Sequence, residues 1–301
     1  MEKIIRIDTI DEYNKLFGWE TKHPLVTVID MNKVNPERVP RGEVAYSYGV
    51  YALFLKQTYC GDITYGRQPY DYQEGTVTSF APGQVVHIKH KPDYKPNALG
   101  LLFHPDLISG TPLGRDIRHF NFFSYSSTEA LHLSEKERQI YTECLANIDA
   151  ELDRGIDRHT RPLICRNIEL LLEYCMRFYD RQFVTREHVN HNVLIKFERL
   201  LNDYFDGHKA AQLGLPSVRY FAEHCFLSPN YFGDLVKKET GRTPLEMIQT
   251  KVMDIAKNEL LGTSKTISEI SEQLGFQYSQ HFNRYFKKSV GMTPSEYRKR
   301  P

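Results

Sequence analysis

A repeated segment near the carboxyl end is the feature that most restricts how this chain can fold. The thirteen-residue segments that begin at Phe232 and Phe282 align without gaps at an offset of fifty residues. Six positions are identical: the phenylalanine, a Lys-Lys pair, a glycine and a Thr-Pro pair. A repeat of this length in a region of helical pattern indicates one supersecondary unit that is used twice.

Local signals predict where the helices of both units begin and end. The Thr-Pro-x-Glu sequence that closes each repeat, from Thr243 and from Thr293, is a capping box with proline at the first helical position. Ser228 precedes Pro229 in the same way, and a glycine ends each lysine-rich helix. These signals predict helices at 218–225, 229–240, 245–261, 267–274 and 279–289.

The predicted order of helices is typical of a tandem DNA reader. A short helix, a tight turn and a second helix occur twice, at 217–240 and 266–289, and a long helix joins the two units. Helix-turn-helix units bind DNA by laying the second helix in the major groove. The connecting helix would be roughly 25 Å long, so the two reading helices could lie about one DNA turn, ~34 Å, apart.

Side chains that face outward on the second helix of each unit are candidates for DNA contact. Those suited to base edges are Asn230, Asp234, Gln280, Asn283 and Arg284, because amides pair with adenine, arginine with guanine and carboxylates with cytosine. Those suited to phosphates are Lys237, Lys238, Lys287, Lys288 and Arg298. Four lysines alone would indicate a solvated surface, but their recurrence beside the same Phe, Gly and Thr-Pro residues favours DNA. For Arg298, at the chain end, phosphate contact and disorder are both open.

The first two thirds of the chain change character near residue 130. Before it, dense Pro and Gly punctuation separates short runs rich in Tyr, Val, Phe, Thr and Ile, such as 44–55, 76–80 and 85–90. Such runs predict an antiparallel sandwich or small barrel. After it, helical periodicity appears at 134–152, 160–182 and 189–206. The apolar stripes of these helices are interpreted as internal core, and a dimer contact along one of the first two is open.

Composition and charge exclude several classes of protein. The longest uncharged stretch, 75–88, has 14 residues, whereas a membrane-spanning helix needs about 20. The N-terminus has no apolar segment of a secretory signal, and the five scattered cysteines contain no Cys-x-x-Cys pair. We therefore expect a cytoplasmic protein with no membrane partner. Residues 207–301 hold 14 Lys and Arg against 9 Asp and Glu, a bias that favours nucleic acid.

Residues 217–301 resemble the DNA-binding domain of the AraC/XylS transcriptional regulators. The resemblance is strongest over 274–300, which carries the Gly-Phe, Phe, Arg, Phe-Lys-Lys, Gly, Thr-Pro and Tyr-Arg residues of that signature. It adds Ser279 to the candidate base contacts. The first unit departs from the family pattern at Gly233 and Asp234, so the second unit is expected to carry more of the direct readout. The resemblance implies binding of double-stranded promoter DNA and, usually, activation through RNA polymerase.

The N-terminal strands look like the cupin-type sensor domain of the same family. The predicted fold class is therefore α+β, with an N-terminal β-sandwich or cupin-like barrel followed by an all-α domain of two helix-turn-helix units joined by a long helix. The predicted domains are a sensor at 1–130, a helical linker or dimerisation segment at 131–188, and a DNA-binding domain at 189–301. The predicted function is a homodimeric transcriptional regulator that responds to a small-molecule effector.

Two alternatives concern the N-terminal domain. It could only dimerise or bind a protein partner, or it could be a metal-dependent cupin enzyme. Against the enzyme, the candidate ligands His87, His90 and His104 lack metal-site spacing, and 87 and 90 fall on opposite faces of a strand. We therefore expect no cofactor and no catalytic residue. The tyrosines of the strands fit either a ligand pocket or a packed core; they are Tyr46, Tyr48, Tyr51, Tyr59 and Tyr65.

Overall fold

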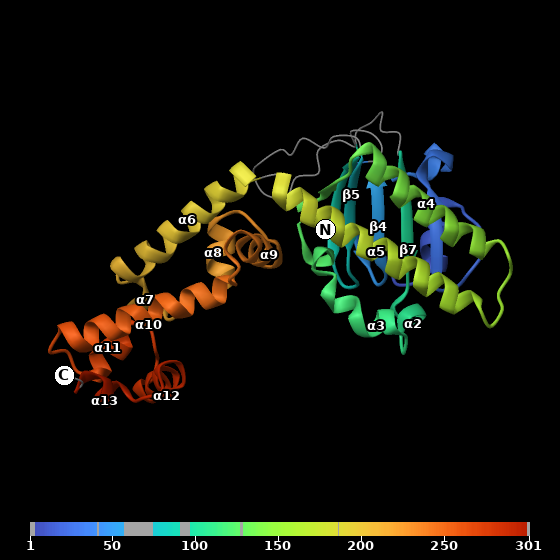
Figure 1. Ribbon diagram of the computed structural model, residues 1–301. Helices are drawn as coiled ribbons and strands as arrows, with labels where there is room; N and C mark the ends of the chain where they lie inside the picture. Colours follow the sequence, from blue (N-terminus) through green and yellow to red (C-terminus); the bar gives the residue numbers. More distant parts are fainter. Residues whose placement is uncertain are drawn as a thin grey trace. The chain divides into compact units, whose positions relative to one another are not determined.

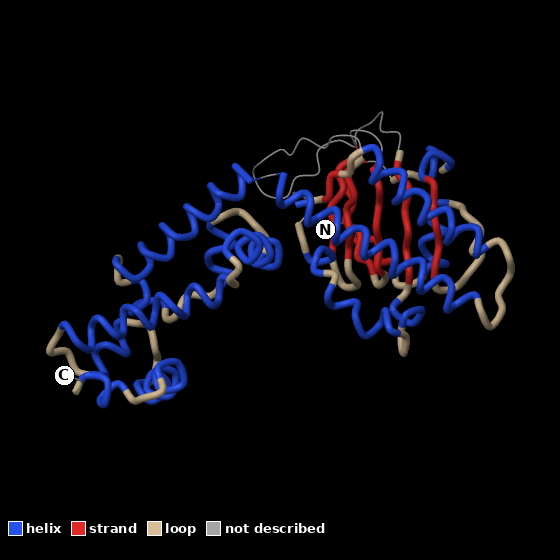
Figure 2. The backbone as a smooth tube through the Cα atoms, in the orientation of Figure 1, coloured by secondary structure: helices blue, strands red, loops and turns tan. Residues whose placement is uncertain are grey.

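The computed structural model describes residues 4–40, 42–56, 75–90, 97–126, 129–185 and 187–299, and divides into two units, 1–185 and 186–301. The predicted fold class is confirmed, because the first unit contains the strands and the second is helical (Figures 1 and 2). The division lies at 185/186, near the end of the predicted segment 131–188. Most of it belongs to the first unit.

The described strands of the first unit form two sheets. The smaller has the order β1 (Ile4–Ile7), β3 (Gly42–Tyr48) and β6 (Val85–His90). The larger has the order β2 (Val26–Asp30), β7 (Ala98–Phe103), β4 (Tyr51–Lys56), β5 (Thr76–Phe80) and β8 (Leu131–His132). Neighbouring strands are antiparallel except for β1 and β3, which are parallel. The predicted strands 76–80 and 85–90 are confirmed, and the predicted run 44–55 is two strands with a turn between them.

The two sheets share one apolar core. Tyr46 and Tyr48 of the smaller sheet are buried with Ala52 and Leu102 of the larger one, and Tyr48 stacks on Phe80 with ring centroids 5.9 Å apart. Burial raises the pKa of Tyr46 to about 12. These two tyrosines therefore pack the core. Tyr59 and Tyr65 lie outside the described residues.

Glycine at position 100 on β7 makes room for side chains of the two neighbouring strands, β2 and β4. A Cβ there would lie 2.8 Å from Ile29 and 2.9 Å from the ring of Phe54. Both side chains belong to the core between the sheets. The glycine therefore leaves room that these two side chains fill.

Two long helices, α4 (Glu135–Leu152) and α5 (Thr160–Thr185), pack on each other and on the larger sheet (Figures 1 and 2). Ser134 and Glu137 form the predicted capping box at the start of α4. The predicted stripes face inward, since Leu145 and Ile148 on α4 and Ile168 on α5 are buried. The interpretation as core is confirmed for these residues, whereas Leu163 of the predicted stripe on α5 is 45% exposed.

Shorter elements complete the first unit. The helices are α1 (Ile10–Phe17), α2 (Pro105–Ile108) and α3 (Pro112–Asp116). Short 3-10 turns lie at Met31–Lys33, Pro36–Arg38, Ile117–His119 and Asn121–Ser124.

The second unit contains the predicted order of helices. They are α6 (Glu187–Asp206), α7 (Lys209–Leu213), α8 (Val218–His224), α9 (Pro229–Thr240), α10 (Pro244–Gly262), α11 (Ile267–Gln273), α12 (Ser279–Val290) and α13 (Pro294–Arg298). Predicted and observed bounds agree to within about two residues for α6 and for α8 to α12. The short helix α7 lies in a stretch where Gly207 and Pro216 predict a break.

Candidate nucleic-acid interface

Each helix-turn-helix unit has an aromatic core that fixes its second helix. Phe232 of α9 is fully buried and meets Phe197 of α6 edge to face, with ring centroids 5.1 Å apart. Phe282 of α12 is fully buried between Phe276 and Phe286, at 5.3 and 5.7 Å. The phenylalanine shared by both repeats is therefore the residue that seats each reading helix on its support.

Capping boxes repeat at the same places in both units. The backbone N–H of Thr243 donates to Glu246 at 2.7 Å, and that of Thr293 donates to Glu296 at 2.8 Å. These hydrogen bonds hold the pKa of both carboxyls below its ordinary value. Lys237 adds a smaller electrostatic contribution at Glu246, and Lys287 does so at Glu296. The fifty-residue repeat therefore includes the carboxylate that lies near each of these lysines.

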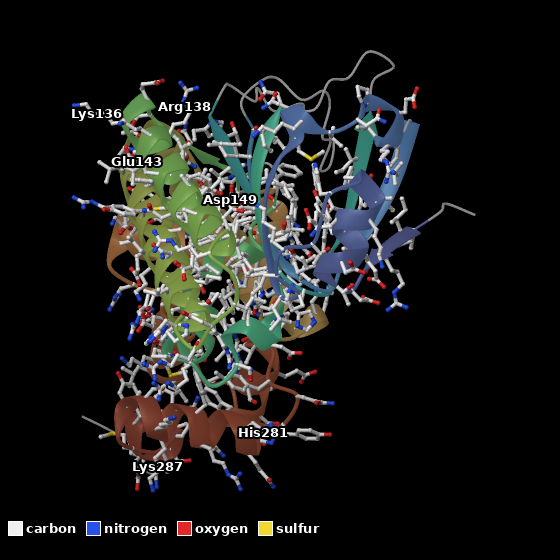
Figure 3. The ribbon with its side chains drawn as sticks, turned by 90° about the vertical axis from the view of Figure 1, so that its right-hand side faces the viewer. Lys136, Arg138, Glu143, Asp149, His281 and Lys287 are labelled. Atoms are coloured by element: carbon white, nitrogen blue, oxygen red, sulfur yellow. The ribbon has the colours of Figure 1, made fainter. Side chains whose placement is uncertain are left out.

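The outer face of α12 is polar and basic. Gln280, Arg284, Lys287 and Lys288 are exposed, whereas Ser279 is partly buried. Figure 3 shows Lys287 on the outer side of this helix. Gln280 and Arg284 are four residues apart, so they lie on one helix face and could meet neighbouring base pairs.

The outer face of α9 is less basic. Asn230, Lys237 and Lys238 are exposed, and Asp234 is partly buried. Gly233 offers no side chain there. This contrast in charge accords with the expectation that α12 makes more of the direct base contacts.

Asn283 is placed differently from the other candidates. Its Oδ1 atom is enclosed and has no hydrogen-bond partner among the residues that the structure describes. An asparagine reads adenine through both its oxygen and its nitrogen. With the oxygen enclosed, Asn283 can present only its amide nitrogen unless the side chain turns.

Two exposed residues of this site escaped the sequence analysis. Tyr278 is 57% exposed at the N-cap position of α12, and its ring meets that of His281 at 5.4 Å. His281 is exposed on the outer side of the helix (Figure 3). His281 is three residues before Arg284, a spacing that places both on one side of a helix. That spacing was the signal that could have identified His281.

Arg298 has a role inside the domain. Its Nε donates to the carbonyl of Leu260 at 3.0 Å, and its Nη2 is buried. Leu260 lies in the last turn of α10, where carbonyl groups lack helical partners. The guanidinium therefore ties α13 to the end of α10, and we leave Arg298 out of the proposed phosphate contacts.

A close backbone contact joins the end of α7 to the turn of the second helix-turn-helix unit. Gly275 has φ +87°, and a Cβ there would lie 2.6 Å from the carbonyl carbon of Gly214 and 2.8 Å from the carbonyl oxygen of Ala210. The two helix-turn-helix units are thus connected twice, through α10 and through this contact. In Figure 1 both α9 and α12 are seen nearly along their axes, so these axes are close to parallel.

In the turn of the first helix-turn-helix unit, the left-handed residue after the C-cap of α8 is Phe226. This residue has φ 60° and is 82% exposed, with the ammonium of Lys196 4.6 Å from its ring centroid. A left-handed conformation is unusual for a bulky residue. The first turn therefore has no close partner of the kind that Gly275 meets.

Two of the three candidate metal ligands of the first unit have described side chains, His87 and His104. His104 accepts the backbone N–H of Asp106 at the start of α2, and His87 lies within β6. The side chain of His90 is outside the described part of the chain. In the ranges that the structure describes, no three His, Cys, Asp or Glu side chains are grouped so as to hold a metal ion.

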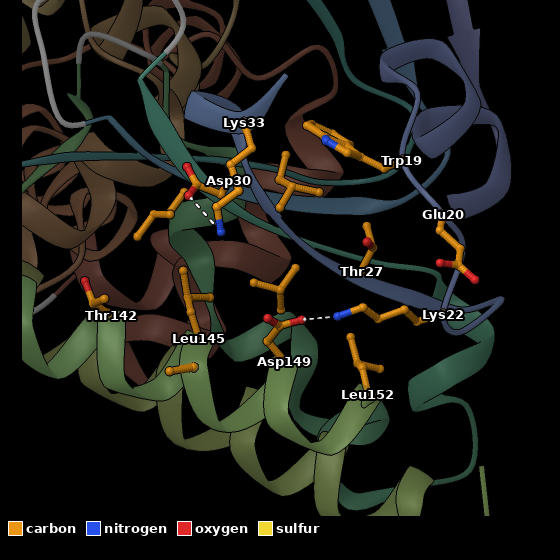
Figure 4. A pocket seen from close by; sticks show the side chains of 14 residues that line it. Trp19, Glu20, Lys22, Thr27, Asp30, Lys33, Thr142, Leu145, Asp149 and Leu152 are labelled. Atoms are coloured by element: carbon orange, nitrogen blue, oxygen red, sulfur yellow. Dashed lines mark hydrogen bonds and ion pairs between the residues drawn. The ribbon is translucent and has the colours of Figure 1, made fainter. Parts of the chain in front are cut away.

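The first unit also has a groove of about 410 Å³ between β2 and α4. Its lining includes Trp19, Lys22 and Asp149 (Figure 4). Among the described residues, no helix is both long and apolar enough to cross a membrane.

Comparison with known proteins identifies relatives of the second unit. The family described as "Helix-turn-helix domain" matches residues 221–300. The HTH-type transcriptional regulator YobQ of Bacillus subtilis is 37% identical over 82 residues, which are 27% of this chain and 34% of that protein. The HTH-type transcriptional regulator YijO of Escherichia coli is 26% identical over 229 residues, 75% of this chain and 76% of that protein.

A solved structure matches the same region. The C-terminal domain of the two-component response regulator yesN from Fusobacterium nucleatum is 29% identical, with 34% of this chain and 97% of that chain covered and a TM-score of 0.30. The chain spans between a tenth and a half of the length of several curated relatives.

Proposed function

We propose that the protein regulates transcription by reading promoter DNA with α9 and α12, because residues 221–300 match a helix-turn-helix domain family. The proposal rests chiefly on the outer face of α12, where Gln280 and Arg284 stand beside Lys287 and Lys288. The test is selection of bound duplexes from a random library by the full chain. Enrichment of one sequence is expected, and recovery of random sequence would contradict the proposal.

Arg284→Ala is expected to weaken binding to the selected sequence by about 1–3 kcal/mol and to relax preference at one base pair. The reason is that arginine pairs with guanine through two hydrogen bonds, which no other base pair satisfies as well. Affinity for each single-base variant of the selected site gives the measurement. An equal loss on every sequence, including unrelated DNA, would assign Arg284 to the phosphates instead.

Lys287→Ala is expected to weaken binding almost equally on all sequences and to lower the salt slope of log K by about one. A lysine beside a phosphate displaces a counterion, and that release carries no sequence information. Lys136→Ala is the matched control and should leave the salt slope unchanged. Lys136 is an exposed residue of α4 in the first unit (Figure 3). A changed sequence preference at constant slope would refute the phosphate role.

We propose that the protein is a homodimer and that α5 forms the contact. Leu163 and Leu170 are 45% and 47% exposed on this helix, whereas α4 exposes no large apolar side chain. They are seven residues apart and share one face. With α5 of a second copy antiparallel and the pair centred midway between these leucines, Leu163 of each copy would face Leu170 of the other.

Leu170→Glu is expected to raise the dimer dissociation constant about tenfold or more, because the contact would then bury a carboxylate, and each ~1.4 kcal/mol corresponds to a factor of ten. Sedimentation equilibrium measures the change. Leu213→Glu, at a leucine that is 65% exposed in the second unit, is the control and should have no effect. Unaltered association of the Leu170 variant would remove α5 from the interface.

The first unit is proposed to sense a small-molecule effector, and the DNA-bound protein to activate transcription through RNA polymerase in the cytoplasm. These proposals come from the resemblance to the AraC/XylS regulators. The groove between β2 and α4 supports an effector over the alternative of a unit that only dimerises or binds a protein partner.

A further inference from the structure

The groove between β2 and α4 borders the core between the two sheets, with which it shares Ile29 and Trp19. The strand β2 is an edge of the larger sheet, and α4 runs across the sheet beside it. Leu99, Leu145 and Leu152 give the groove an apolar lining (Figure 4). At about 410 Å³ the groove lies in the size range of small-molecule sites.

Trp19 gives the groove an aromatic wall. Its ring packs against Tyr13 and Phe17, with centroids 6.0 and 5.4 Å apart, and the side chain is only partly buried. A tryptophan face attracts a cation that approaches within about 6 Å. Trp19 is also the one tryptophan of the sequence, so its fluorescence reports on this groove alone.

The charged side chains of the groove are mostly carboxylates. Lys22 lies between Asp149 at 3.2 Å and Asp153 at 2.7 Å, and Lys33 lies 3.5 Å from Asp30 (Figure 4). Both lysines are therefore already paired.

Glu20 adds a further carboxylate to the lining. No hydrogen bond or ion pair joins it to another residue that the structure describes. A ligand that enters thus meets an available carboxylate and no available cation.

We propose that this groove binds an organic amine with an apolar body. The ammonium group would lie against Trp19 and Glu20, and the apolar body would cover the leucines of β7 and α4. The alternative of an anionic ligand is disfavoured because it would have to displace a carboxylate from Lys22 or Lys33. Binding here does not require the DNA-reading role of the second unit, so the two proposals can fail separately.

The test uses the full chain and three compounds of matched shape: 4-phenylbutylamine, the neutral 4-phenylbutanol and the anionic 4-phenylbutyrate. The amine should change Trp19 fluorescence saturably and bind about fivefold or more tightly than the alcohol, since the carboxylate and the aromatic face both favour a cation. Isothermal titration calorimetry should give one amine bound per chain. No saturable signal, equal affinity for the alcohol, or tightest binding of the butyrate would each overturn the proposal.

Two variants locate the bound amine. Ala146→Phe, at an exposed groove residue of α4, should abolish amine binding by filling the space. Glu20→Gln should weaken it about threefold, whereas Glu143→Gln, on the same helix as Ala146 but outside the groove, should not. Thermal melts show whether each variant is folded. Unchanged amine affinity in folded Ala146→Phe would place the amine elsewhere.

Discussion

Phe282→Ala is expected to destabilise the second helix-turn-helix unit by about 3–5 kcal/mol. The ring is fully buried and contacts both Phe276 and Phe286. Its loss leaves a cavity under α12 that these fixed neighbours cannot fill. Urea unfolding followed by far-ultraviolet circular dichroism measures the effect, and the fluorescence of Trp19 identifies the separate transition of the first unit, whose helices α4 and α5 also contribute to the dichroism.

The chain offers two controls for this experiment. Phe226→Ala removes a ring that is 82% exposed in the first helix-turn-helix unit, so its cost should stay within about 1 kcal/mol. Trp19 lies in the first unit, so its fluorescence transition should not move in either variant. Equal midpoints for the Phe282 and Phe226 variants would show that Phe282 is not a core residue.

Gly275→Ala is expected to cost about 2–4 kcal/mol, which combines a left-handed conformation with overlap against backbone. The added Cβ would lie 2.6 Å from Gly214 and 2.8 Å from Ala210, and backbone atoms cannot turn away as a side chain can. The measurement is again the free energy of unfolding by urea. The DNA affinity of the folded fraction should also fall, because the contact of Gly275 with Gly214 and Ala210 helps to orient the second helix-turn-helix unit.

Gly241→Ala is the matched control. Gly241 has φ +72° at the end of α9, and a Cβ there would have no atom within 4 Å. Its cost should be about 1 kcal/mol, from conformation alone. Equal costs for Gly241→Ala and Gly275→Ala would mean that the contact between α7 and the second turn carries no steric constraint.

Features set by neighbouring residues were predictable from the sequence. The capping boxes at Thr243 and Thr293 use partners three residues away, and the structure contains both. The apolar stripe of α12 was also readable, since Phe282 and Phe286 are one turn apart. Tyr285, between these two phenylalanines in the sequence, is only partly buried. Helix bounds depend on such local chemistry and therefore agree closely.

Features set by distant residues were not predictable. The parallel pairing of β1 with β3, and the packing of α4 and α5 on the larger sheet, join segments far apart in the chain. The same holds for Arg298, whose partner Leu260 is 38 residues away. Its basic side chain at the chain end suggested DNA, and only the folded chain reveals the carbonyl that it binds.

The double connection between the two helix-turn-helix units, through α10 and through Gly275, has a consequence for the target. Two reading helices that are held at a fixed distance and orientation require the bases that they recognise to keep a fixed spacing along the duplex. One inserted base pair would turn the far half of the target by about 35°. The regulator would then have to twist the DNA, since its two helix-turn-helix units cannot easily rotate relative to each other.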